Sequence, residues 1–277
     1  MRGALVLLPA IMLLAGCGSD PSSFEGSDDA LKDAGSSRVE YRWTGLGSSF
    51  AGVGAIDYAH DRGELVISSE EMELPGGEMQ VRFIGATTYV GFTLLGRLRW
   101  EKQTEDAPTG TDQFVPGPGG PNADQLLEML TEASKGVDTV GSEEIRGVPS
   151  THYRAHLDPK KLGEDVSDLP EELVADAWID GDGLLQRLRL PIGDGATMTV
   201  DLYDFGVKVD VEAPPADELV SEDEMTELME KDCAGRKIRE NDFCAMSVGG
   251  EGSGTQSYDE GQISPTETMP RTVTESR

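Results

Sequence analysis

The sequence predicts an α+β fold in which one large, curved antiparallel sheet of about eleven strands has helices on one face. Three observations lead to this fold class. Apolar and polar residues alternate with a period of two through much of residues 38–212. Turns rich in Gly and Asp, such as 61–63 and 180–183, separate neighbouring segments. The 121–136 segment, in contrast, has the spacing of an amphipathic helix.

The predicted strands are short segments with one apolar and one polar face. Val39, Tyr41 and Trp43, for example, alternate with charged residues, as expected for a strand that is half buried. In chain order, strands are predicted at residues 38–43, 52–58, 64–69, 80–83, 87–92, 98–103, 137–145, 150–157, 173–179, 184–190, 197–202 and 207–212.

Two helical segments are predicted between the strands. The longer one, 121–136, begins at a Pro-Asn pair and ends at Gly136. A shorter one is expected at 159–162 or 170–173, each of which begins with a proline. The longer helix is expected to cover the sheet with an apolar stripe that includes Leu126, Leu127 and Leu130.

Residues 1–16 have the layout of a lipoprotein signal peptide. Arg2 supplies a positive charge, an apolar run follows, and the run ends in Leu-Ala-Gly immediately before Cys17. The run of about 12 residues would cover roughly 18 Å as a helix, which is too short to cross a bilayer core of about 30 Å. We expect cleavage before Cys17 and attachment of lipid to its thiol. That lipid would hold the protein on the outer face of the cell membrane, since two or three acyl chains anchor a protein stably.

The composition limits the partners of the chain. Its 277 residues carry a formal net charge of −29, which makes nucleic acid a poor partner. Cys233 and Cys244 are the two remaining cysteines. We expect them to form a disulfide, because disulfides persist in exported proteins and no histidine lies near either thiol. We expect a monomer with this organisation: a disordered tether at 17–37, one domain at 38–215, an acidic helix and disulfide loop at 216–246, and a disordered tail at 247–277.

The sequence contains no recognisable catalytic motif. It has no Gly-x-Ser-x-Gly elbow, no His-Glu-x-x-His pair and no phosphate-binding glycine loop in a strand-to-helix context. His152 and His156 lie about 13 Å apart on one predicted strand, too far to share a metal ion. The acidic turn 180–183 resembles the start of a calcium loop, but the closing carboxylate is missing, so a hairpin turn is favoured. We expect no enzyme activity, no metal and no cofactor.

Several motifs resemble one protein family. The residues at 141–154, 177–187, 203–206 and 211–215 follow one another as they do in actinobacterial lipoproteins of the LppX/LprG type, and the resemblance extends over about 38–219. Those lipoproteins are related in fold to the LolA and LolB lipoprotein carriers. The resemblance implies a half-barrel whose concave face is covered by helices, leaving an apolar cavity that holds the acyl chains of lipids or lipoglycans.

Two functions follow from these observations. The first is a membrane-anchored lipoprotein that binds or carries lipid or lipoglycan acyl chains in an apolar cavity outside the cytoplasm. The alternative is an envelope interaction or sensory lipoprotein whose interior is filled by side chains, with an envelope protein as its partner. For the first function, the candidate cavity residues are Leu126, Leu127 and Leu130 from the helix and Phe83, Trp178 and Leu202 from the sheet.

Overall fold

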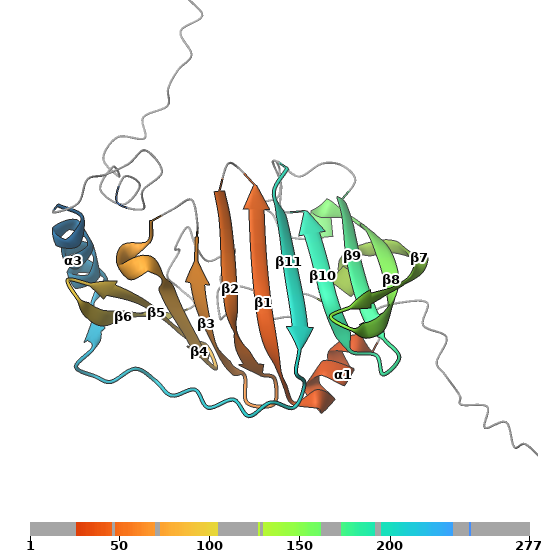
Figure 1. Cartoon of the computed structure of the whole chain (residues 1–277), viewed down its shortest axis with the longest axis horizontal. Helices are drawn as coiled ribbons and strands as arrows, with labels where there is room; N and C mark the ends of the chain where they lie inside the picture. The colour runs from red at the N-terminus through yellow and green to blue at the C-terminus, as the bar shows by residue number, and fades with distance from the viewer. Residues whose placement is uncertain are drawn as a thin grey trace, which may run out of the picture.

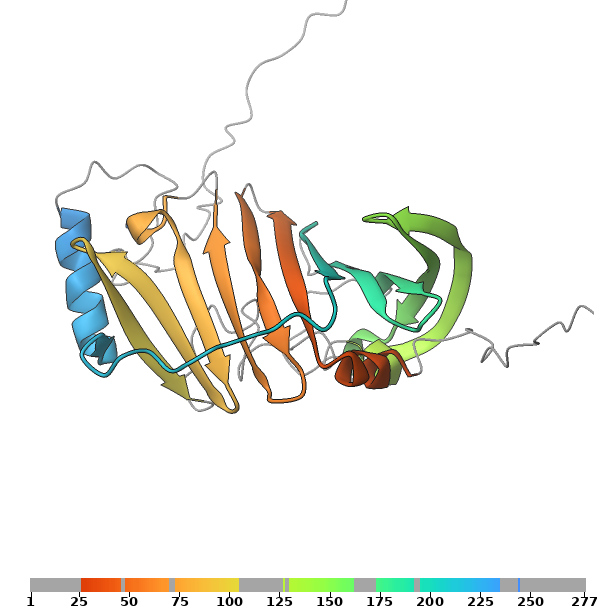
Figure 2. The same cartoon turned by 60° about the horizontal axis from the view of Figure 1, so that its bottom comes forward.

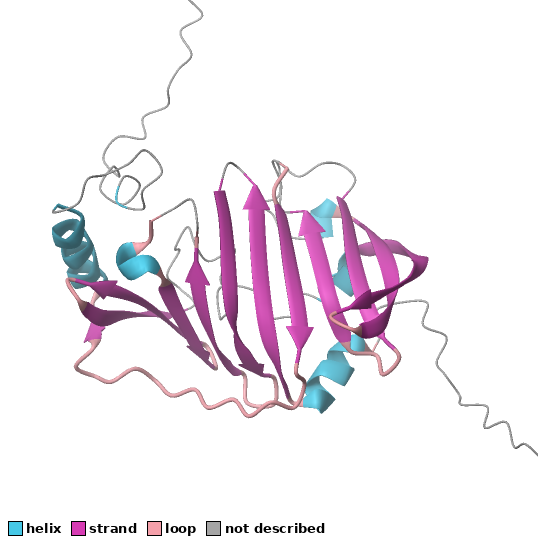
Figure 3. Cartoon of the chain, in the orientation of Figure 1, coloured by secondary structure: helices cyan, strands magenta, loops and turns pink. Residues whose placement is uncertain are grey.

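The computed structural model describes residues 26–45, 48–69, 73–104, 127, 130–161, 173–191, 195–234 and 244. These residues form one open, twelve-stranded sheet with few helices (Figures 1 and 3). The strand order is β12-β6-β5-β4-β3-β2-β1-β11-β10-β9-β8-β7. Every neighbouring pair is antiparallel except β12 and β6, which are parallel. The predicted α+β half-barrel is therefore confirmed.

The chain builds the sheet as two meanders that meet at β1 and β11. The first meander runs from β1 to β6 and the second from β7 to β11, and the antiparallel pairing of β1 with β11 joins them. The strands are β1 (Ser36–Gly45), β2 (Ser48–Asp57), β3 (Arg62–Ser68), β4 (Met79–Ile84), β5 (Thr87–Leu94), β6 (Arg97–Thr104), β7 (Ser134–Ile145), β8 (Val148–Leu157), β9 (Leu173–Asp180), β10 (Leu185–Pro191), β11 (Thr197–Tyr203) and β12 (Leu219–Val220).

Helical segments lie at three places along the described chain. Helix α1 (Ser27–Ala34) precedes β1, and α3 (Glu222–Ala234) follows β12. Helical residues at 127 and 130–133 precede β7. Two short 3-10 turns, Pro75–Gly77 and Pro159–Lys161, complete the set.

Two of the predicted boundaries are wrong. The last part of the predicted tether, 17–37, is ordered, because Ser27–Ala34 form helix α1 and its Leu31 is completely buried in the core. The short polar helix carries only one strongly apolar anchor, so its composition resembled that of a flexible linker. The helix predicted to end at Gly136 ends at residue 133, and Gly136 lies in β7, where a bulge accommodates it.

A third difference concerns the segment between β11 and α3. Residues 204–218, here called the strap, leave the end of β11 and cross the lower ends of several strands to reach β12 (Figure 2). The predicted strand at 207–212 is therefore wrong. Val209 and Val211 are buried. The alternation of apolar and polar residues at 207–212 therefore reflects an extended chain that packs against the sheet without pairing as a strand. Two consecutive prolines, at 214 and 215, also lack the N–H groups that pairing requires.

Candidate functional site

The register of the sheet separates two faces of different chemistry. Residues directly opposite one another in antiparallel strands point to the same face. Val39 lies opposite both Gly54 and Leu202, and this side, which contributes to the buried core, is called the apolar face. Glu40 lies opposite Asp201, and this side is called the polar face.

Most of the predicted cavity residues come together on the apolar face. Phe83 of β4 and Leu202 of β11 belong to the same buried cluster as Leu127 and Leu130 from the helical segment before β7. None of the four side chains is more than 1% exposed. Leu126, like Cys17, lies outside the described residues. The helical segment and the two halves of the sheet thus share one apolar core.

Trp178 does not join this cluster, and the prediction that it shares a cavity with Phe83 is wrong. It lies opposite Arg187 of β10 and His152 of β8, which places it on the polar face. Its neighbour Ala177 occupies the apolar face instead. Successive residues of a strand point to opposite faces of the sheet, so Ala177 and Trp178 cannot both face the core. The sequence contains no signal that assigns the smaller of the two to the core.

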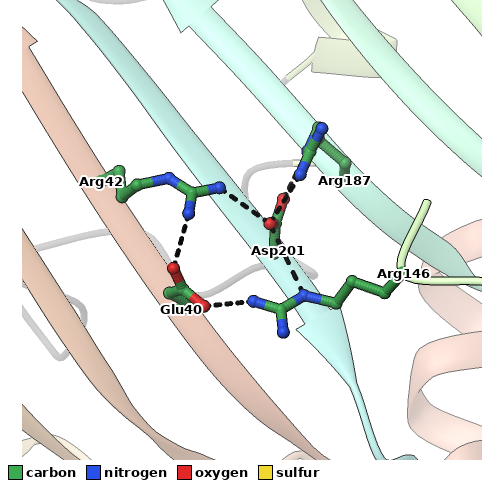
Figure 4. A network of polar contacts seen from close by, with 5 residues as sticks. All are labelled: Glu40, Arg42, Arg146, Arg187 and Asp201. Carbon is green, nitrogen blue, oxygen red and sulfur yellow. Dashed lines mark hydrogen bonds and ion pairs between the residues drawn. The ribbon is translucent and has the colours of Figure 1, made fainter.

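The polar face carries a connected network of charges at its centre (Figure 4). The side chain of Asp201 is only 1% exposed. It accepts hydrogen bonds from Nε and Nη2 of Arg187, at 2.6 and 2.8 Å, and from Nη2 of Arg42 at 3.0 Å. Arg146 forms a third ion pair with it, at 3.7 Å. Arg42 and Arg146 also contact Glu40, so two carboxylates are shared among three guanidinium groups.

The network fixes the charge state of Asp201. Burial alone would raise the pKa of this carboxyl, but the hydrogen bonds and charge of Arg187, with the charges of Arg42 and Arg146, outweigh burial and hold the pKa below its usual range. The hydrogen bonds to Asp201 in turn raise the pKa of Arg187 above its ordinary value. Asp201 and Arg187 are therefore both charged at neutral pH.

Aromatic rings extend the network along the polar face. The guanidinium group of Arg146 lies 4.1 Å from the centre of the Tyr203 ring, and that of Arg187 lies 6.0 Å from the Trp178 ring. Trp178 stacks on His152 with 4.3 Å between ring centres. Such cation–π and stacking contacts order long side chains at a surface.

Sequence reasoning missed this network. The signal was present in the repeated charges at polar positions of β1, where Arg38, Glu40 and Arg42 alternate with core residues. Identifying their partners requires the pairing of β1 with β11, which joins residues about 160 apart in the chain. Arg146 comes from a turn, and no alternation pattern could assign it to the network.

A groove lies beside the network on the same face. It has a volume of about 230 Å³, below the roughly 300 Å³ at which pockets for drug-sized ligands begin. Three charged residues line it, together with polar, aromatic and aliphatic groups from β1 to β4, β6 and β11. The lining residues are Arg38, Val53, Gly54, Glu64, Leu65, Val66, Gln80, Val81, Arg82, Trp100 and Tyr203.

Two further predictions, the disulfide and the hairpin turn at 180–183, have outcomes within the described chain. Cys233 and Cys244 form a disulfide with 5.6 Å between their Cα atoms. The turn after β9 is a hairpin turn in which Oδ1 of Asp180 accepts hydrogen bonds from two backbone N–H groups of the turn. The described residues contain no cluster of three or more side chains suited to a metal ion. None of the described helices has the length and apolarity needed to cross a bilayer.

Comparison with known proteins gives a partial sequence match and several structural ones. No family model matches the chain. An uncharacterized 31.2 kDa protein from the rplA-rplJ intergenic region of Streptomyces griseus is 32% identical over 113 residues. The match spans 34% of this chain and 37% of that relative, so the chain covers just over a third of the relative's length.

Solved structures similar to this chain include two mycobacterial lipoproteins. LppX from Mycobacterium tuberculosis has a TM-score of 0.47 and 17% identity, and the match covers 67% of this chain and 94% of LppX. LprF from Mycobacterium bovis has a TM-score of 0.48 and 15% identity, with coverages of 70% and 95%.

Proposed function

We propose that this protein is a membrane-anchored extracytoplasmic lipoprotein that binds the acyl chains of lipids or lipoglycans between the apolar face and the helical segment over it. The observation that carries the proposal is the shared cluster of Phe83, Leu127, Leu130 and Leu202. One layer of helix meets a broad curved sheet there, and separating the two would present apolar surface on both sides. The anchor would be lipid on Cys17.

The energetics of such a site are favourable. Each methylene transferred from water into an apolar site contributes about 0.8 kcal/mol. An acyl chain that enters between helix and sheet would therefore offset much of the cost of separating them. The described helical residues over the sheet, 127 and 130–133, would move away from it when an acyl chain enters.

The experiment is native mass spectrometry of the chain carrying Cys17→Ser, expressed with its export signal so that it meets envelope lipids. We expect retained lipid that is released on denaturing extraction and that competes with an apolar fluorophore. Absence of both retained lipid and fluorophore competition would refute the carrier function.

A second function is favoured by one specific observation. The four clustered side chains are at most 1% exposed, so in this conformation they fill the space that they enclose. An envelope interaction or sensory lipoprotein would use such a filled half-barrel as a rigid platform for a protein partner. The same experiment separates the two functions, because a filled core neither retains lipid nor binds the fluorophore.

A further inference from the structure

The groove on the polar face combines three features of an anion-binding site. The first is its charge. Arg38 and Arg82 line it together with one carboxylate, Glu64, so the charged residues of the lining sum to a single positive charge, while Asp204, outside the lining, pairs with Arg38.

Both arginines pair with exposed carboxylates that a ligand can displace. Arg38 lies 3.3 Å from Asp204, and Arg82 lies 3.8 Å from Glu64. The carboxylate side chains are 64% and 51% exposed, and exposed ion pairs of this kind contribute little to stability. An anionic group entering the groove can replace these contacts at small cost.

The second feature is an unused hydrogen-bond donor. Trp100 lines the groove, yet the residue is only 1% exposed. Its buried indole Nε1–H has no acceptor among the residues that the structure describes. A buried donor without an acceptor destabilises the free protein, and a ligand oxygen that reached this donor would remove that cost.

The position of Trp100 is fixed by its neighbours. Gly91 lies directly opposite it on β5, and a Cβ atom there would come within 2.7 Å of the indole ring. Arg82 covers the ring, with its guanidinium carbon 4.7 Å from the ring centre. Arg82 also donates a hydrogen bond to the backbone oxygen of Glu212 in the strap, at 3.3 Å. The donor and the cation are thus held together before any ligand arrives.

The third feature is an apolar strip within the groove. Val53 and Val66 lie opposite each other in β2 and β3 and are 51% and 37% exposed. They are two of the four exposed large hydrophobic residues among the described positions. A ligand that covers them would gain apolar burial as well as charge contacts.

We propose that the groove binds a small oxyanion, a phosphate or carboxylate, carried on a short organic body. Arg38 and Arg82 supply the positive charge, the Trp100 indole donates a hydrogen bond, and Val53 and Val66 contact the organic body. The volume of about 230 Å³ restricts the ligand to something the size of a glycerol phosphate or a single acidic sugar. The site lies on the opposite side of the sheet from the proposed acyl site and does not depend on it.

The overall acidity of the chain does not prevent this binding. At physiological ionic strength, charges more than about 8 Å apart are largely screened. The potential within the groove is therefore set mainly by Arg38, Arg82 and the two carboxylates that pair with them, while the remaining acidic surface acts mainly on the long-range approach of a ligand.

The test is a titration of the full chain carrying Cys17→Ser, followed by the indole N–H signals of its three tryptophans in ¹⁵N–¹H NMR spectra. The probes are glycerol 3-phosphate, glucuronate and inorganic phosphate, with glycerol as the neutral probe. Trp100→Phe assigns its signal. We expect the Trp100 signal to shift with an anionic organic probe at a Kd of about 1 mM or tighter, and the Trp43 and Trp178 signals to stay in place.

Matched variants separate the groove from the rest of the polar face. Arg38→Gln, Arg82→Gln and Val53→Glu should each weaken binding by about tenfold or more. Arg189→Gln, an exposed arginine outside the groove, and Val140→Glu, at a valine 49% exposed on β7, should leave binding within about twofold.

The outcomes decide the proposal and its ligand class. Preference for glycerol 3-phosphate indicates a phosphorylated head group, preference for glucuronate an acidic sugar, and equal binding of inorganic phosphate a site for the oxyanion alone. The proposal is overturned if no anionic probe moves the Trp100 signal below about 10 mM, or if the two control variants lose as much affinity as the groove variants.

Discussion

At the scale of single residues, Asp201 shows how the polar face is held together. Its carboxylate is almost fully buried yet charged, because three arginines from β1, β10 and the turn between β7 and β8 surround it. Each arginine comes from a different part of the chain. The contacts therefore join the two meanders across the β1–β11 pair, where no short connection links them.

Replacing Asp201 by Asn should destabilise the fold by about 2–3 kcal/mol, measured by urea unfolding at pH 7. Loss of one member of a buried ion pair costs about 3–5 kcal/mol, and the value here is reduced because the arginine side chains remain 29–45% exposed. The control is Asp204→Asn, whose exposed pair with Arg38 should contribute less than about 1 kcal/mol. Equal effects of the two variants would contradict the account of the network.

The same residue predicts a pH dependence. Because the pKa of Asp201 is lower in the folded state than in the unfolded chain, its stabilising effect is complete above the ordinary aspartate pKa of about 4. The effect is lost as the pH falls through the folded-state value. The difference in unfolding free energy between the native chain and Asp201→Asn should thus be constant from pH 5 to 7 and shrink below about pH 4. A difference that grows in acid would contradict this assignment.

At the scale of elements, the glycines of β2 show how closely two strands approach. A Cβ atom on Gly54 would lie 1.9 Å from the backbone oxygen of Glu64 in β3. At Gly52, two residues earlier on the same face, the nearest atom would be a side-chain carbon of Ile67 at 3.3 Å. The two glycines of the Gly-Val-Gly sequence therefore have different roles.

Gly54→Ala should cost more than about 2 kcal/mol of stability, because a backbone oxygen cannot move aside as a side chain can. Gly52→Ala should change stability by less than about 1 kcal/mol, since Ile67 can shift slightly and alanine restricts the unfolded chain. Thermal unfolding of both variants measures the difference. Comparable losses at the two positions would mean that the strands are not packed as described.

Helix α3 contributes a second element-scale prediction. It packs Met225 against the end of β5 and closes the edge of the sheet near β6. Glu101 of β6 is partly buried there, and burial together with the charge of Glu222 raises its pKa above the ordinary value. Its ionised form therefore opposes folding at neutral pH.

Glu101→Gln should increase the free energy of unfolding at pH 7, by less than about 1 kcal/mol because solvent screens a group that is only partly buried. A raised folded-state pKa means that the protonated form is compatible with folding, so the gain should vanish below about pH 4, where Glu101 is protonated in both states. Urea titrations at pH 7 and pH 3.5 measure both quantities. Exposed Glu212→Gln is the control, and a loss of stability in Glu101→Gln at pH 7 would contradict the prediction.

At the scale of the whole molecule, the sequence predicts the strands of the sheet better than the segments that pack against them. Period-two alternation and turn residues located the eleven longer strands. Most of these strands bury one face in the core, as Val39 and Val200 illustrate, whereas β7 is exposed along most of its length. Alternation failed at 207–212 because an extended chain lying on a sheet buries every second residue in the same way. Alternation also assigned Trp178 to the wrong face. Both faces of β9 bury side chains, so a large apolar residue buried on the polar face cannot be distinguished by pattern from a residue of the apolar core.

The arrangement of the two faces is a property of the whole molecule that no single segment carries. The polar network and the groove both depend on long-range register, which joins residues such as Arg42 and Asp201 that lie far apart in the chain. The apolar cluster was more accessible to prediction, because hydrophobic residues at strand and helix spacing must meet somewhere in a single core.

The most direct test of the account asks which face of the sheet an acyl chain contacts. A fatty acid carrying a photoreactive diazirine would be incubated with the full chain carrying Cys17→Ser, irradiated, and the labelled peptides identified by mass spectrometry. The account predicts label on the segments that contain Phe83, Leu130 and Leu202, and reduced label when an unmodified lipid competes. Label confined to the polar face around Val53 and Val66, or label that no lipid displaces, would contradict it.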